Sequence, residues 1–304
     1  MQTAESLKRT LVVTEELQSV VKTMKALAGV NIRQYERAAH AVTEYNRTVE
    51  MGLRIALPHL PAHLLKPPES PRGKLGAVVF GSDQGMCGQL NDQVVSYASR
   101  ALQKLAFHHK EQMTLAVGAR AAGQLEERGR VIQGPVQLPS SIAGITAAVE
   151  EVLRTIESWH FSGGVEFVVL FYAHPLSGAW YRVRGVRLLP VDAEWIHHLQ
   201  SRPWPTKMIP TFTMDEKRLF QVLIREYLFV SLFRAFAESL ASENASRLAS
   251  MQVAERNIEE HLRLLTNESR QLRQTTITSE LLDIISAYEA LQVKKRHGSS
   301  SAGF

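Results

Sequence analysis

The stretch MQVAERNIEEHLRLLTNESRQLRQTTITSELLDII, from Met251 to Ile285, decides the fold of this chain. It belongs to a longer segment, from about Met214 to Arg296, that contains no glycine and no proline. Its apolar residues, with two polar ones between them, follow at steps of three and four: Leu248, Met251, Glu255, Ile258, Leu262, Leu265, Ser269 and Leu272. This spacing predicts one strand of a coiled coil. A helix of about 80 residues is on the order of 120 Å long, so it needs a partner helix and other subunits along its length.

A second long helix is predicted at the other end of the sequence, over residues 3–57, with Pro58 ending it. Its apolar positions also follow mostly at steps of three and four: Leu7, Leu11, Leu17, Val21, Met24, Ala28, Tyr35, Ala39, Val42, Val49, Leu53 and Ala56. The simplest pairing is an antiparallel coiled coil with the rest of the chain forming a separate lobe. Two independent bundle helices are the alternative, but bundles rarely need helices of this length.

Strand and helix patterns alternate between the two long helices. Strands are predicted over Leu75–Gly81, Met113–Val117, Val165–Ala173 and Ala179–Val191. A helix is predicted over Leu90–Phe107, a second one from the end of the strand Met113–Val117 through Glu127, and a third over Ile142–Trp159. This order indicates an α/β, Rossmann-like lobe whose sheet is mostly parallel with an antiparallel edge.

Proline-rich stretches set the predicted domain boundaries. The expected organisation is an N-terminal helix at 1–57, a linker at 58–74, the lobe at 75–213, a C-terminal helix at 214–296 and a flexible tail at 297–304.

Composition restricts the functional classes. The net charge of +5 and the pI of about 9.3 describe a mild, dispersed basic excess without the basic and aromatic stripe of a nucleic-acid protein. A single cysteine, Cys87, excludes an intramolecular disulfide and fits a reducing compartment. We expect neither a signal peptide nor a membrane span, because the start is charged and no apolar run approaches 18 residues.

The segment GSDQGMCGQLN, Gly81–Asn91, follows a predicted strand and precedes a helix, where phosphate loops occur. The spacing of Gly81, Gly85 and Gly88 matches neither G-x-G-x-x-G nor a loop ending in Gly-Lys-Ser/Thr. We therefore expect a tight turn with a surface role and no nucleotide site.

No residue set predicts catalysis, a metal or a cofactor. Cys87 lacks an oriented base, so a structural or interface thiol is expected. The pairs His108–His109 and His197–His198 are adjacent in sequence and cannot share one helix face as metal ligands. The basic residues on the first helix leave two readings open, contact with acidic partner loops or a solvated face: Lys22, Lys25, Arg33 and Arg37.

Three stretches resemble the gamma subunit of F-type ATP synthases: VVKTMKALAGVNIRQYERA (Val20–Ala38), FGSDQGMCGQLN (Phe80–Asn91) and the block Glu243–Ile284. The motif R-Q-x-x-I-T-x-E-L stands whole at Arg273–Leu281. At Met86, Gln89 and residues 26–31 the sequence departs from the residues that this family usually has. These departures resemble the divergent, alternate branch of bacterial ion-pumping ATPases.

The resemblance implies a noncatalytic central-stalk rotor. Its coiled coil would lie inside a hexamer of three alpha and three beta subunits, and its lobe would bind the epsilon subunit and the c-ring. The chain would couple ATP synthesis or hydrolysis to H⁺ or Na⁺ translocation, peripherally at the cytoplasmic face of the bacterial inner membrane. It would have no small-molecule substrate and no nucleic-acid partner.

The resemblance also implies contact residues. Met24 and Lys25 with Arg273, Gln274 and Thr278 would form a collar that engages a beta-subunit loop. Asp83, Gln84 and Cys87 would meet the lower rim of the beta subunits. The apolar tip would sit in an upper bearing through Leu282, Ile284, Ile285 and Leu291. The outer faces of the coiled coil are expected to be polar.

The residues alone also allow two other functional classes of protein to be considered. A stand-alone α/β enzyme needs an acid/base or metal set, which the lobe does not offer. A stand-alone coiled-coil adaptor with an α/β ligand-binding lobe, or one that binds nucleic acid, remains the alternative function.

Overall fold

The computed structural model describes residues 4–59, 73–105, 111–176, 180–191, 193–204, 207–208 and 210–298. The elements follow in chain order as α1 (Ala4–Ala56), η1 (Leu57–His59), β1 (Lys74–Phe80), α3 (Leu90–Lys104), β2 (Gln112–Val117), α4 (Ala119–Glu127), β3 (Ile132–Val136), α5 (Ile142–Gly163), β4 (Val165–Pro175), β5 (Tyr181–Leu189), α6 (Ala193–Ser201) and α7 (Glu216–Gly298). Most of the predicted linker and the end of the predicted tail, at 60–72 and 299–304, lie outside the described residues.

The chain divides into two compact units, which are described separately. One unit combines Met1–Met24 with Met251–Phe304, and the other is Lys25–Ser250. Both long helices therefore contribute to both units.

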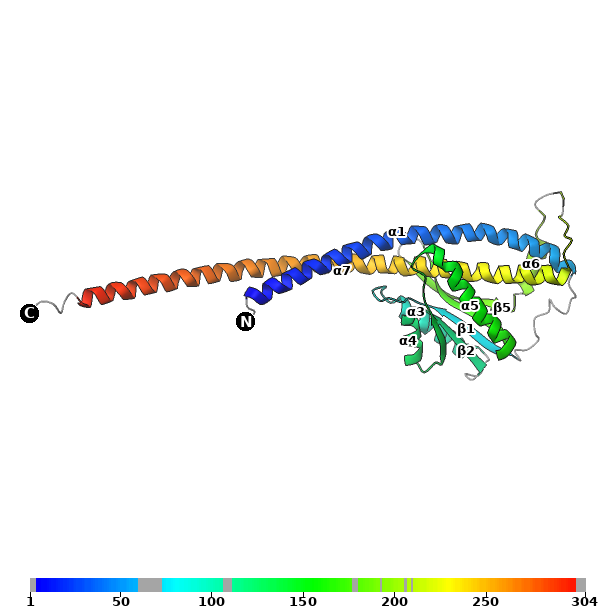
Figure 1. Cartoon of the computed structure of the whole chain (residues 1–304), viewed down its shortest axis with the longest axis horizontal. Coiled ribbons are helices and arrows are strands. Elements are labelled where there is room, and N and C mark those ends of the chain that lie inside the picture. Colours follow the sequence, from blue (N-terminus) through cyan, green and yellow to red (C-terminus); the bar gives the residue numbers. More distant parts are fainter. Residues whose placement is uncertain are drawn as a thin grey trace, which may run out of the picture. The chain divides into compact units, whose positions relative to one another are not determined.

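The Lys25–Ser250 unit contains a five-stranded sheet in the order β3-β2-β1-β4-β5. Figure 1 labels β1, β2 and β5 of this sheet. The strands β1, β2, β3 and β4 pair in parallel, whereas β5 pairs with β4 antiparallel. This confirms the predicted α/β lobe with a mostly parallel sheet and an antiparallel edge.

The sequence analysis missed two elements. The edge strand β3 carries Gly134 and Pro135, and only its last residue is buried, so it lacks an apolar pattern. Proline is tolerated there because an edge strand does not need every ladder hydrogen bond. The nine-residue helix α6 lies in the proline-rich stretch and packs through Trp195 and Leu199 against α1 and α7. It is too short for its periodicity to stand out.

Helices cover both faces of the sheet. On one face, Leu75, Ala77 and Val79 of β1 pack with apolar residues of α3 and α4. On the other face, Val78 and Phe80 pack with residues of α5 and α7. Burial on both faces explains why β1 reads as a continuous apolar run.

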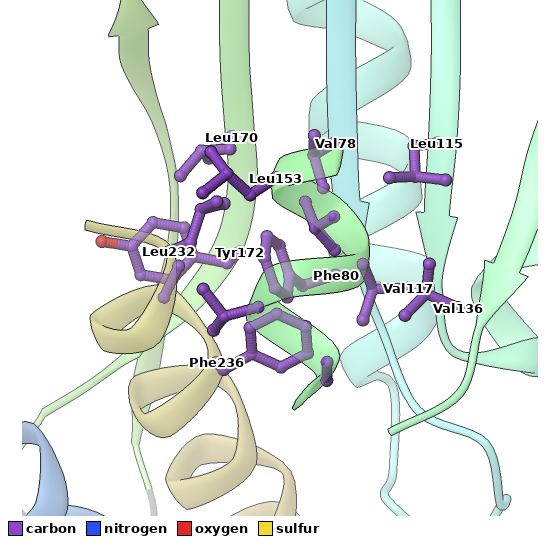
Figure 2. Packing of buried hydrophobic residues seen from close by; sticks show 14 of the residues in the cluster. Val78, Phe80, Leu115, Val117, Val136, Leu153, Leu170, Tyr172, Leu232 and Phe236 are labelled. Atoms are coloured by element: carbon purple, nitrogen blue, oxygen red, sulfur yellow. The ribbon is translucent and has the colours of Figure 1, made fainter. Parts of the chain in front are cut away.

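Aromatic rings join α7 to the sheet. Figure 2 shows Phe80 of β1 between Tyr172 of β4 and Phe236 of α7. The centroids of the Phe80 and Phe236 rings are 5.0 Å apart at 87°, an edge-to-face contact. Every residue from Ala235 to Ser246 is buried, so this part of α7 is covered on all sides.

Within Lys25–Ser250, α1 and α7 run antiparallel. Asn31 Nδ2 lies 3.5 Å from Asn244 Oδ1, and the Tyr45 hydroxyl donates to Glu226 Oε1 at 2.9 Å. Positions that rise along α1 therefore meet positions that fall along α7, which confirms the predicted antiparallel pairing.

The unit of Met1–Met24 and Met251–Phe304 has the predicted seam on α7. Met251 and Leu265 are buried and Ile258, Leu262 and Leu272 are half-buried, whereas most residues between them are exposed. From Arg273 to Tyr288 every side chain is exposed. The seam spacing of the C-terminal helix is thus confirmed as far as Leu272.

The first helix needs two corrections. Leu17, predicted among its seam positions, is 52% exposed, and Thr14 and Gln18 take the inward positions beside it. The outer faces are also less polar than predicted, since several large apolar side chains are about half exposed: Val12, Val13, Val20, Leu27 and Val30. Leu17 was misassigned because two apolar stripes share α1 and the sequence does not mark which one is buried.

Adjacent leucines on α7 provide a test of the seam. Leu265 is 6% exposed, whereas Leu264 is 62% exposed. We expect Leu265→Lys to lower the free energy of unfolding by about 2–5 kcal/mol, because it buries a charge and removes a packed side chain. Leu264→Lys, the matched control, should change it by less than about 0.5 kcal/mol. Denaturation followed by circular dichroism measures both, and equal effects would place the seam elsewhere.

Candidate functional site

The glycine-rich turn after β1 is closed by its own side chains. Asn91, in the first turn of α3, accepts a hydrogen bond from the Ser82 amide at 2.9 Å and donates to Ser82 Oγ at 2.8 Å. The Asn91 amide also lies 3.4 Å from Cys87 Sγ. All three residues are buried, so the polar groups of the turn are satisfied from within.

Two glycines of this turn are explained by packing. A Cβ on Gly81 would lie 2.4 Å from Cβ of Ala121 on α4. Gly88 has φ of +58°, and its Cβ would lie 3.1 Å from Ser246 Oγ on α7. The two glycines therefore allow α4 and α7 to approach the turn closely. This agrees with the prediction of a tight turn.

Asp83 has a structural role in this conformation. Its Oδ1 accepts a hydrogen bond from the Ala119 amide at 2.9 Å, and its Oδ2 accepts one from the Leu138 amide at 2.8 Å. One carboxylate thus connects the turn to the start of α4 and to the segment after β3.

The outer surface of the turn comes from Gln84 and Met86. Gln84 is exposed, and Met86, at φ of +62°, is 57% exposed. Cys87 is only 1% exposed, and burial raises the pKa of its thiol, opposite to the shift that activates a nucleophile. Of the three residues predicted to meet a beta subunit, only Gln84 presents its side chain fully to the outside.

The predicted collar residues differ in their exposure. Met24 and Lys25 are half-buried on α1, whereas Arg273, Gln274 and Thr278 are exposed on α7. Arg273, Gln274 and Thr278 lie within two turns of uninterrupted helix. The collar as a whole stays a prediction.

The tip of α7 is apolar and exposed. Leu282, Ile284 and Ile285 are 58%, 66% and 53% exposed, whereas the side chain of Leu291 lies outside the described residues. Three exposed apolar residues that were not predicted, Ile277, Leu281 and Tyr288, continue this surface and follow with Ile284 at steps of three and four. Their spacing was the signal that could have found them.

The remaining sequence candidates are basic residues of α1 and two histidine pairs. Lys22, Arg33 and Arg37 are exposed, which leaves both readings of the basic face open. His197 and His198 are exposed on α6, whereas His108 and His109 lie outside the described residues. Over the described ranges, no three His, Cys, Asp or Glu side chains are placed to hold a metal. In the same ranges, no helix has the length and apolar character needed to cross a membrane.

Glu243 of α7 is a buried charge that the sequence analysis missed. It is 6% exposed, and its Oε1 accepts a hydrogen bond from Arg247 Nη2 at 2.6 Å, while its Oε2 has no protein partner. Burial raises the pKa of the Glu243 carboxyl, Arg247 opposes this rise, and Asp83 adds to it. The same carboxylate contributes to the raised pKa of Tyr35 on α1. Glu243 therefore interacts electrostatically with groups from three places: Asp83 of the turn after β1, Tyr35 of α1 and Arg247 of α7.

The raised pKa makes a pH-dependent prediction. A carboxyl whose folded pKa exceeds its unfolded value of about 4.3 stabilises the fold below that value and loses this contribution as pH rises through the folded pKa. Glu243→Gln stays neutral, so its stability relative to the wild type should increase as the pH rises above the unfolded pKa and through the folded pKa. The increase should be about 1.4 kcal/mol for each pH unit between the two pKa values.

Urea unfolding at several pH values measures this difference. Glu260→Gln, which changes an exposed carboxylate of the same helix, is the matched control. A Glu243→Gln difference that is constant with pH, or that falls as pH rises, would contradict a raised pKa at Glu243.

Comparisons with known proteins agree with this arrangement. A family model described as ATP synthase matches residues 3–291. The chain is 26% identical over 288 residues to the ATP synthase gamma chain of Thermobifida fusca, which covers 91% of this chain and 93% of the relative. It is 27% identical over 304 residues to that of Chlorobaculum tepidum, covering 96% and 100%.

The fold is also similar to solved structures. The rotor of the Euglena gracilis mitochondrial ATP synthase aligns with a TM-score of 0.62 at 14% identity, over 90% of this chain and 98% of that one. The central stalk and c-ring structure from Tetrahymena thermophila contains a chain that aligns with a TM-score of 0.55 at 18% identity, over 77% and 99%. These likenesses concern the fold, and the family match extends over nearly the whole sequence. The chain belongs to the ATP synthase gamma family.

Proposed function

We propose that this chain is the noncatalytic central-stalk rotor of an F-type ATP synthase. It couples ATP synthesis or hydrolysis in an alpha–beta hexamer to H⁺ or Na⁺ movement through a c-ring. The observation that carries the proposal is the pairing of α1 with α7 together with an α7 tip that is apolar and exposed, in a chain of the ATP synthase gamma family.

The exposed tip supports a surrounding partner. Leu281, Leu282 and Ile284 are each more than half exposed in the part of α7 that follows its seam. A helix that shows apolar side chains on adjacent faces is stable when something covers it. The ring of three alpha and three beta subunits, acting as the upper bearing, is the cover we propose, and Leu291 belongs to this surface in the proposal.

The exposed polar residues support reversible coupling. Arg273 and Gln274 are exposed on adjacent positions of α7 and can make directed hydrogen bonds with a beta-subunit loop. Such bonds form and break as a shaft turns, whereas a broad apolar surface would favour one pose. We propose that Met24 and Lys25, together with Arg273, Gln274 and Thr278, form the collar that engages this loop.

The lobe supports a contact with the lower rim of the beta subunits. We propose that Gln84 makes this contact together with Met86, and that Asp83 and Cys87 act by holding the turn in shape. The epsilon subunit and the c-ring are the proposed partners of the rest of the lobe. The chain would work peripherally at the cytoplasmic face of a bacterial inner membrane, in the divergent, alternate branch of these ATPases.

The ligand-binding adaptor is less well supported. Its natural site would be the turn after β1, but Ser82, Cys87 and Asn91 fill that turn with their own hydrogen bonds. Little polar capacity is left there for a ligand.

Co-expression with the alpha and beta subunits of the same organism tests the proposal. We expect native mass spectrometry to find one copy of this chain for every three alpha and three beta subunits, with ATPase activity that depends on it. A chain that stays a monomer or homodimer under these conditions would refute the rotor and favour the adaptor.

The contact at Arg273 and Gln274 has its own test. In the assembled, membrane-bound complex, Arg273→Ala with Gln274→Ala should lower ATP-driven ion transport several-fold while assembly is retained, because directed bonds to the beta subunit are lost. Thr275→Ala with Ser279→Ala is the control, since these exposed side chains point about 100° or more around the helix from Arg273 and Gln274. Full transport in the Arg273/Gln274 variant would remove both residues from the coupling contact.

A further inference from the structure

A row of buried polar residues lies on one face of α7 where the helix crosses the sheet. Glu238, Ser242 and Ser246 follow at steps of four and are 4%, 0% and 8% exposed. Their neighbours in the helix, such as Phe236 and Leu240, belong to the apolar core. A buried polar group without a hydrogen-bond partner lowers the stability of the fold, so the partners of these three residues indicate their role.

Glu238 connects α7 to both strands of the β4–β5 hairpin. Its Oε2 accepts a hydrogen bond from Arg184 Nη2 of β5 at 2.5 Å and lies 2.8 Å from His174 Nδ1 of β4. Its Oε1 accepts one from Arg234 Nε of the same helix at 3.0 Å. One buried carboxylate is thus shared by three cationic or ionisable groups from three elements.

The two serines connect α7 to the backbone of the lobe. Ser242 Oγ lies 3.0 Å from the carbonyl oxygen of Ala173 in β4 and 2.8 Å from that of Glu238. Ser246 Oγ donates to the carbonyl oxygen of Cys87 at 2.6 Å, and Gly88 leaves room for this approach. The row therefore touches the carboxyl ends of β4 and β1, the two neighbouring central strands.

Directional contacts set an angle, whereas apolar packing mainly sets a distance. The apolar contact of a helix with a sheet changes little when the helix turns slightly about its axis. A hydrogen bond or ion pair weakens steeply when its geometry departs from linear. Three such contacts spread over about 12 Å of helix oppose rotation of α7 against the lobe.

We propose that Glu238, Ser242 and Ser246 are positioning residues that form a torsional clamp between α7 and the α/β lobe. The clamp transmits torque from the long helix to the lobe without slip. This inference rests on the proposed rotor function and identifies the contacts through which that rotor carries its load.

The test removes two contacts of the clamp and keeps the helix. In the assembled complex the hexamer is immobilised and a probe is bound to the lobe. The variant Ser242→Ala with Ser246→Ala should raise the angular variance of the probe about two-fold during each pause of rotation. The reason is that two of the three directional attachments are lost. The number of ions moved per ATP should fall while the ATPase rate is retained.

Ser239→Ala is the matched control. Ser239 is a 1% exposed serine of the same helix whose hydroxyl has no protein partner. It should leave the angular variance and the ion-to-ATP ratio unchanged. Equal effects of the control and the double variant, or unchanged variance and ratio in the double variant, would overturn the clamp.

Failure of the rotor proposal is distinguishable from failure of the clamp, because the unaltered chain would then not assemble with alpha and beta subunits.

Discussion

The fold of the Lys25–Ser250 unit depends on the complete burial of α7 between Ala235 and Ser246. In this stretch α7 packs against the sheet and against α1 at the same time. Its apolar side chains, such as Phe236 and Leu240, join the core that also contains Phe80 and Tyr172. In a helix covered on all sides a buried polar group is costly without a partner, which explains the partners of Glu238, Ser242 and Ser246.

The same constraint accounts for the turn after β1. Because Ser246 donates to the carbonyl of Cys87, and a Cβ at Gly88 would crowd that hydroxyl, the turn is shaped by α7. Asp83 then fixes the turn to α4 through the Ala119 amide. A segment that in sequence looks like a ligand loop is therefore part of the joint between helix and lobe, and its exposed side chains are those of Gln84, Met86 and Gln89.

Burial and exposure divide α7 by task. Its sheet-covered stretch has no side chain left for a partner, whereas from Arg273 to Tyr288 every side chain is exposed. Between them the seam at Met251 and Leu265 buries one stripe only. The clamp that we propose lies where the helix meets the lobe, and the exposed side chains proposed to make reversible contacts lie in the later part of α7. For a rotor this separates the part that must hold from the part that must release.

The sequence by itself determined the two long helices, the α/β order of the lobe and the seam from Met251 to Leu272, because these depend on local periodicity and on helix-breaking residues. It could not reveal β3, whose Gly134 and Pro135 erase the pattern, nor that Leu17 faces outward, since α1 carries two apolar stripes. Only the tertiary structure decided that Cys87 is buried, that Asp83 binds two backbone amides, and that Glu238 meets His174 and Arg184. These contacts join residues far apart in the chain, and a spacing rule carries no information about which distant side chain will share a core.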